Sequence, residues 1–142
     1  PTTAAGTFTY VLISVQDAST TACTQAQTGS VDVIVNPLPT ATISGPAPVC
    51  QGGSAPVVTF TGAGGTAPYT FTYTINGGAN QTVTTTSGNS VTVTVPTTAA
   101  GTFTYVLISV QDASTTACTQ AQTGSVDVTV NPLPVTSPIY HN

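Results

Sequence analysis

The amino-acid sequence predicts an all-β protein made of tandem antiparallel β-sandwich repeats of 95 residues. Residues 1–39 and 96–134 are identical at 38 of 39 positions, at an offset of 95, and differ only where Ile34 is replaced by Thr129. Apolar residues alternate with Thr or Ser in several short runs, which indicates half-solvated strands, and no segment has a helical period. A fixed period indicates an array of similar units, and about 95 residues suits a whole β-sandwich.

Seven strands are expected in one unit, and turn residues separate them. Asn76-Gly77-Gly78 suits a tight hairpin with positive φ, and Ser87-Gly88-Asn89 suits another. Seven short strands at this spacing are typical of an immunoglobulin-like fold. The expected strands span residues 40–44, 55–61, 69–75, 81–86, 90–95, 101–111 and 123–130.

Two proline-rich segments, residues 36–39 and 131–134, set the expected domain boundaries, because alternating prolines prevent strand pairing. Residues 1–35 are then the C-terminal part (the last two strands) of a preceding repeat, and 40–130 form a complete repeat. Residues 131–142 are a linker and the start of the next segment. Since two strands cannot cover an apolar face alone, the missing strands are expected before Pro1 in the same polypeptide or, as an alternative, from a neighbouring chain in a fibre.

The charge of the chain excludes several kinds of partner. There is no Lys or Arg, and the net charge of −4 comes from four aspartates, Asp17, Asp32, Asp112 and Asp127. Nucleic acids and anionic membranes both require basic residues, so neither is an expected partner. No apolar run approaches the length of a membrane span, so membrane insertion is not expected. With 39% hydrophobic residues and almost no charge, the chain is expected to fold.

The titratable residues predict neither catalysis nor a cofactor. General acid–base chemistry needs several positioned groups, and His141, the only histidine, is expected to be an exposed tail residue. Asp112 and Asp127 are candidate calcium ligands, but calcium loops usually contain several carboxylates close together. Asp112 is therefore expected to cap a turn and Asp127 to face solvent. No metal site is predicted.

The three cysteines are candidates for disulfide bonding. Cys23 and Cys118 are equivalent in the repeat, so each unit has two cysteines, and an even number per extracellular domain favours a disulfide. Cys50–Cys118 within one unit is preferred, since it would close a long loop and stabilise the fold by about 4 kcal/mol. Cys23 would then pair with a residue N-terminal to this sequence. A Cys23–Cys50 bridge between neighbours and free buried thiols are the alternatives.

Two features bear on sugars. Asn80-Gln81-Thr82 matches the N-glycosylation tripeptide. Tyr69, Tyr73 and Tyr105 could stack on a glycan, but their alternation with polar residues predicts that they lie in the core instead.

Five segments carry a resemblance to a known family: Val49-Cys50-Gln51-Gly52, residues 74–89, Gly101-Thr-Phe-Thr-Tyr105, Ala117-Cys118 and Asn131-Pro-Leu-Pro134. They resemble repeats of large Bacteroidota cell-surface proteins, the gliding-motility-associated, type IX-secreted adhesins with immunoglobulin-like or PKD-like modules. The resemblance implies an extracellular or cell-surface location, a role in adhesion, gliding or fibres, and pairing of Cys50 with Cys118. PKD modules often have Trp in the third strand, where this chain has Phe71 or Tyr73, so that subfamily is not implied.

The expected function is a structural repeat of an extracellular bacterial surface filament or adhesin stalk, without enzyme activity. A glycan-binding module of a surface adhesin is the alternative. The expected partners are neighbouring repeats in the same chain and identical chains in a fibre.

Overall fold

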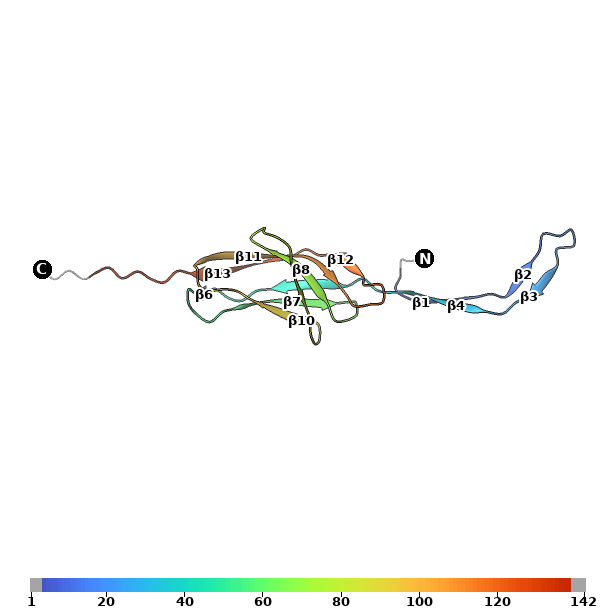
Figure 1. Ribbon diagram of the computed structural model, residues 1–142, viewed down its shortest axis with the longest axis horizontal. Helices are drawn as coiled ribbons and strands as arrows, with labels where there is room; N and C mark the ends of the chain where they lie inside the picture. Colours follow the sequence, from blue (N-terminus) through green and yellow to red (C-terminus); the bar gives the residue numbers. More distant parts are fainter. Residues whose placement is uncertain (1–3, 139–142) are drawn as a thin grey trace. The chain divides into compact units, whose positions relative to one another are not determined.

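The computed structural model describes residues 4–138, which form strands and no helix, and hence no helix that could span a membrane. The chain divides into two compact units, unit 1 (Pro1–Pro37) and unit 2 (Leu38–Asn142) (Figure 1). The division falls inside the proline-rich segment at residues 36–39. His141 lies outside the described residues.

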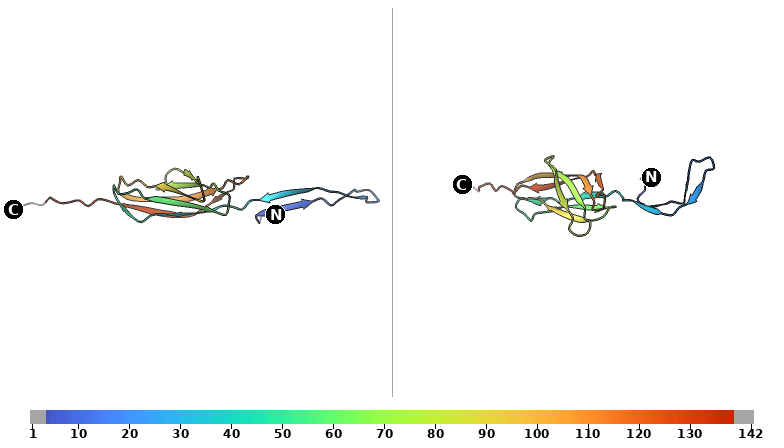
Figure 2. Two further views of the ribbon diagram at one scale, coloured as in Figure 1. Left: turned by 90° about the horizontal axis from the view of Figure 1, so that it is seen from below. Right: turned by 45° about the vertical axis from the view of Figure 1, so that its right-hand side comes forward.

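Unit 2 is a sandwich of two sheets with an immunoglobulin-like strand order (Figures 1 and 2). The smaller sheet has the order β10-β7-β5, from β5 (Thr40–Ser44), β7 (Val57–Ala63) and β10 (Ser90–Thr94). The larger has the order β6-β13-β11-β8-β9, from β6 (Val49–Cys50), β8 (Thr70–Ile75), β9 (Gln81–Thr84), β11 (Gly101–Gln111) and β13 (Ser125–Asn131). β12 (Thr119–Ala121) also pairs with β11. The strand at the start of unit 2 is thus divided: β5 joins the smaller sheet, and β6 joins the larger one in parallel with β13.

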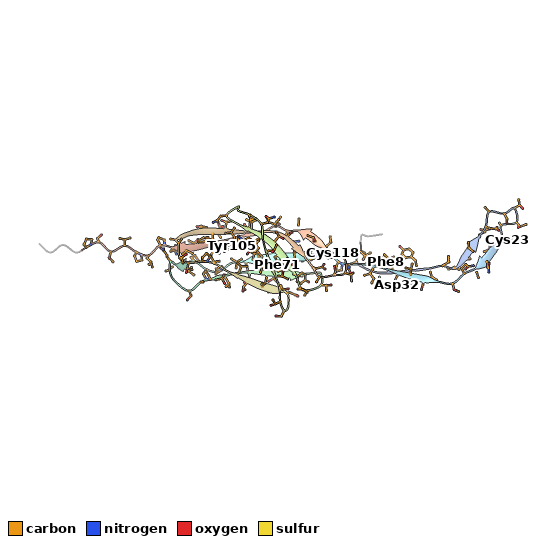
Figure 3. All side chains as sticks on the ribbon, in the orientation of Figure 1. Phe8, Cys23, Asp32, Phe71, Tyr105 and Cys118 are labelled. Atoms are coloured by element: carbon orange, nitrogen blue, oxygen red, sulfur yellow. The ribbon has the colours of Figure 1, made fainter. Side chains whose placement is uncertain are left out.

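The core of unit 2 lies between the two sheets and is built around aromatic rings. Phe60 of β7 stacks on Phe71 of β8 with ring centroids 5.7 Å apart, and it also contacts Tyr73 at 4.9 Å. Tyr73 stacks in turn on Tyr105 of β11 at 6.2 Å. Figure 3 labels Phe71 and Tyr105 within the sandwich. Alternation along β7 and β8 puts these rings on one face and threonines on the other, and each ring pair adds about 0.5–1.5 kcal/mol beyond area burial.

Most of the predicted strands are present in unit 2, with three differences. The strand predicted at 123–130 is β13, and two short strands, β12 and β6, were not predicted. Asn76-Gly77 makes the expected hairpin turn, with φ of 51° and 69°. Ser87-Gly88-Asn89 does not make a hairpin, because the strands on either side of it, β9 and β10, belong to different sheets.

Unit 1 is a hairpin with the same pairing as the C-terminal hairpin of unit 2. Its strands are β1 (Gly6–Val11), β2 (Ser14–Gln16), β3 (Thr24–Ala26) and β4 (Ser30–Val35). β1 pairs with β4 from Gly6↔Val35 onward, and β11 pairs with β13 from Gly101↔Val130 onward, so the two registers coincide at an offset of 95. The β2–β3 pairing likewise matches β11–β12. The hairpin therefore takes its register from its own sequence.

One difference between the copies shows what the rest of the sandwich contributes. β11 is a single strand of 11 residues, whereas the same sequence in unit 1 is interrupted at Leu12 and Ile13. In unit 2 the β11–β8 register shifts between Leu107 and Ser109, which is a β-bulge at the equivalent place. Because β8 pairs with β11 on both sides of the bulge, β11 continues through the bulge as one strand. Unit 1 has no such neighbour among its described residues.

Candidate functional site: the inner face of the unit 1 hairpin

The most distinctive surface of the chain is an apolar face on unit 1, which we call the inner face. Its side chains are 45–59% exposed: Tyr10, Leu12, Val15, Val31 and Val33. Their counterparts in unit 2 lie in the core, where Tyr105 and Leu107 are each 1% exposed and Val128 is 0% exposed. Equivalent side chains are therefore buried in the core of unit 2 and exposed on the surface of unit 1.

Unit 2 shows which residues cover this face in a complete sandwich. β8 lies alongside β11 and places Tyr73 opposite Leu107 and Phe71 opposite Val110. From the other sheet, the backbone N–H of Ala41 donates to the Gln122 side-chain oxygen at 3.0 Å. Full burial of a large apolar side chain is worth about 1.5–3 kcal/mol. Since the inner-face residues are about half exposed, covering them would contribute roughly 1 kcal/mol for each side chain.

The two cysteines of unit 2 lie at opposite ends of β11. Cys50 pairs with Asn131, next to the Gly101↔Val130 pair where β11 begins. The carbonyl of Cys118 accepts a hydrogen bond from the Asp112 N–H, 3.0 Å long, just beyond the point where β11 ends. The ten residue steps along β11 correspond to about 33 Å at about 3.3 Å each. A disulfide requires Cα atoms within about 7 Å.

The predicted Cys50–Cys118 disulfide is therefore wrong for this structure, in which Cys23, Cys50 and Cys118 are all free thiols. The thiols are also not buried, since Cys23 and Cys50 are exposed and Cys118 is half-buried. Figure 3 shows Cys23 near the tip of the unit 1 hairpin. Sequence spacing could not reveal this arrangement, because it depends on the division of the initial strand between the two sheets.

Asp112 caps a turn, as predicted, although its side chain is buried. Its carboxylate accepts hydrogen bonds from the Ser114 hydroxyl at 2.7 Å and from the Thr66 N–H at 3.1 Å. Burial alone would raise the pKa of Asp112, but the hydrogen bonds from Ser114, Thr66 and Cys118 outweigh it and hold the pKa below its ordinary value. This carboxylate thus joins the β11–β12 turn to the loop that precedes β8.

The equivalent turn of unit 1 has the same capping arrangement. The Asp17 carboxylate accepts hydrogen bonds from the Ser19 hydroxyl at 2.7 Å and from the Cys23 N–H at 3.0 Å. The Ser19 hydroxyl is the main reason why the pKa of Asp17 is lowered. Hydrogen bonds from Thr21 and Ser19 lower the pKa of the Cys23 thiol. These contacts lie within one turn and do not by themselves make a ligand site.

The two candidate calcium ligands do not come together. Asp127 is exposed and accepts a hydrogen bond from the Thr104 hydroxyl at 2.7 Å across the β11–β13 pair. Thr104 lies in β11 and Asp112 directly follows its last residue, eight residues further on, which is about 26 Å along the strand direction. Within residues 4–138, no three His, Cys, Asp or Glu side chains are grouped as a metal site would require.

The aromatic candidates for sugar stacking are core residues. Tyr69, Tyr73 and Tyr105 are all buried, as the alternation predicted. Burial raises the pKa of Tyr73, and burial together with the nearby Tyr73 raises that of Tyr105. Asn80 of the glycosylation tripeptide is exposed in the turn between β8 and β9.

Comparison with known proteins adds little to this description. No family model matches the chain, and no curated protein matches it. Among solved structures, it is similar to the CARDB domain of a Pyrococcus furiosus protein, at 18% sequence identity and a TM-score of 0.38. That alignment covers 68% of this chain and 96% of the archaeal domain.

Proposed function

We propose that this chain is a structural repeat of an extracellular bacterial surface filament or adhesin stalk, without catalysis. The observation that carries the proposal is the duplicated hairpin, which has one register in unit 1 and unit 2 and a near-identical sequence in both. An array of such units extends a chain by repeating the same packing and introduces no new chemistry.

The side-chain chemistry of unit 2 agrees with a structural role. Asp112 is engaged in capping a turn, and Asp127 is bonded to a threonine across the sheet. The outward positions of β8 and β10 are threonines rather than charged residues, so the surface is solvated mainly by hydroxyl groups. The absence of Lys and Arg also removes every trypsin cleavage site, which suits a protein exposed to proteases.

The proposed extracellular location rests on this composition and on the resemblance to Bacteroidota surface repeats. A disulfide would also favour an extracellular location, but the two cysteines of unit 2 are too far apart to form one. A glycan-binding function is the weaker candidate, because the three tyrosines that could have formed a stacking platform are buried.

Immunogold electron microscopy of cells that produce the full-length protein tests the proposal. An antibody raised against unit 2 should label threads at the cell surface, at several positions along each thread. The same antibody pre-absorbed with the purified 142-residue chain is the control. Label restricted to the cell interior, or to a single point at the tip of each thread, would count against a repeated structural element.

A further inference from the structure

We propose that the inner face of unit 1 binds a second copy of the strand set formed by residues 38–95, joined on the N-terminal side of β1. The proposal deepens the proposed function, on which it rests, by naming the partner of one repeat. Three observations lead to it: the contacts of the equivalent hairpin in unit 2, the interruption between β1 and β2, and the repetition of the segment that joins β10 to β11.

The first observation is that the strand set 38–95 fits this hairpin sequence in unit 2 at the level of single hydrogen bonds. The Asn76 N–H donates to the Thr104 carbonyl, and the Thr104 N–H donates to the Asn76 side-chain oxygen, both at 2.8 Å. Thr9 is the counterpart of Thr104 in unit 1. The Gln122 oxygen that accepts from Ala41 has its counterpart in Gln27. Every hairpin residue in these contacts is therefore present in unit 1.

Apolar contacts point to the same partner. Tyr105 stacks on Tyr73, and a Cβ on Gly124 would lie 3.1 Å from the Ile43 side chain, so the smaller sheet packs directly on the hairpin. In unit 1, the counterparts of Tyr105 and Gly124 are Tyr10 and Gly29, and Tyr10 is 53% exposed. A partner that covers Tyr10 as Tyr105 is covered needs an aromatic residue at the position of Tyr73.

The second observation is the interruption at Leu12 and Ile13, which is what a missing β8 predicts. The same residues form part of one continuous strand in unit 2, where β8 pairs on both sides of the bulge. A β8-like strand beside β1 and β2 would restore continuity. Lateral addition of a strand to an open sheet edge is a common mode of recognition.

The third observation concerns the connection between the strand set and the hairpin. Residues 96–100, Pro-Thr-Thr-Ala-Ala, join β10 to β11, and residues 1–5 have the same sequence immediately before β1. The duplication thus includes the joining segment as well as the hairpin. This favours a partner attached to β1 in the same polypeptide over one supplied by a separate chain.

The strand set within this chain is not the partner, because β11, β12 and β13 already cover it. If unit 1 displaced that hairpin, in the same chain or in another copy, one hairpin would be covered and an equivalent one exposed. The net apolar burial would be close to zero, so such an exchange has no driving force. An additional strand set 38–95 without a hairpin of its own would instead give a net gain in buried apolar area.

The test is a longer chain in which a second copy of residues 38–95 is fused before residue 1. Amide hydrogen exchange of β1–β4 is measured in the fused chain and in the 142-residue chain. We expect the exchange of β1 and β2 amides to slow by about 10³-fold or more, as in a small folded domain. Exchange at an unchanged rate would overturn the proposal.

Two variants of Leu12 test whether the protection depends on the inner face. Leu12→Ala should reduce the new protection of β1–β4 in the fused chain and leave exchange unchanged in the unfused chain, where Leu12 is 52% exposed. Leu12→Asp should abolish it. Protection that is indifferent to both variants would overturn the proposal, because the inner face would then not be the contact surface.

The source of the partner is tested separately. Residues 38–95 are added as a free polypeptide to the 142-residue chain. If the free polypeptide protects β1–β4 and the fused copy does not, the partner comes from another chain and the proposal is wrong. Failure of the fusion experiment leaves the labelling of surface threads unaffected, so the two proposals fail independently.

Discussion

Replacing Leu107 by alanine should destabilise unit 2 strongly, whereas the same change at Leu12 should have almost no effect. The two leucines occupy equivalent positions in identical sequence, yet Leu107 is 1% exposed and Leu12 is 52% exposed. The chain therefore contains its own matched control, in which the local sequence is constant and only burial differs.

The expected magnitude follows from the environment of Leu107. It belongs to the core cluster and lies opposite Tyr73 of β8, so truncation removes buried methyl groups and leaves a cavity. Leu→Ala changes at such sites cost about 2–5 kcal/mol, and about 3 kcal/mol is a reasonable expectation for Leu107. A surface change such as Leu12→Ala is usually worth less than about 0.5 kcal/mol.

Urea denaturation of the 142-residue chain, followed by far-ultraviolet circular dichroism or tyrosine fluorescence, measures both variants. With an m-value of about 1.5 kcal/mol/M, 3 kcal/mol lowers the midpoint by about 2 M. Equal shifts for the two variants would refute the reasoning, since they would mean that Leu12 is already packed. A shift below about 0.3 M for Leu107→Ala would refute it as well.

Three further predictions follow from particular contacts in unit 2. A Cβ on Gly45 would overlap the Val126 side chain, so Gly45→Ala should lower the free energy of unfolding in urea by about 1–3 kcal/mol. Adding Val126→Ala should restore part of that stability. An unchanged stability for Gly45→Ala would contradict the close packing of these two residues. Dithiothreitol should leave the unfolding midpoint unchanged, and a Cys50–Cys118 linked peptide in non-reducing mass spectrometry would contradict this. The folded-state pKa of Asp112 lies below its ordinary value of 3.8, so its stabilisation is present above that pH and is lost as pH falls through the folded-state pKa. The stability difference from Asp112→Asn should shrink accordingly on acidification, and a difference that does not change with pH would contradict the capping role.

The sequence predicts much of the fold because alternation is unambiguous where one face is buried. The 101–111 strand and the 40–44 strand have the predicted bounds, and Tyr73 and Tyr105 lie in the core as their spacing indicates. β6 was missed because two residues cannot show alternation. β12, which pairs with β11, was missed because it has only three residues, and the strand predicted at 123–130 is β13 alone.

The candidate site was only partly predictable. The repeat alone predicts an uncovered apolar face in residues 1–35, and in the structure Tyr10 and Leu12 are about half exposed. The cysteine pairing could not be obtained in this way, because it depends on which end of the sandwich each residue occupies. Cys50 follows β5 by a few residues in sequence, yet it lies beside the last residue of β13.

The register shared by β1–β4 and β11–β13 has a consequence for how the chain folds. Ser109 and Ala121 are 12 residues apart, so the pairing in the hairpin next to its turn is local, and local contacts form quickly. The β11–β8 pairs, such as Val110 with Phe71, span far more chain and must form later. During synthesis the strand set 38–95 emerges before β11–β13, the hairpin that completes unit 2. Rapid closure of that hairpin shortens the time in which the strand set is exposed to the near-identical hairpin of unit 1.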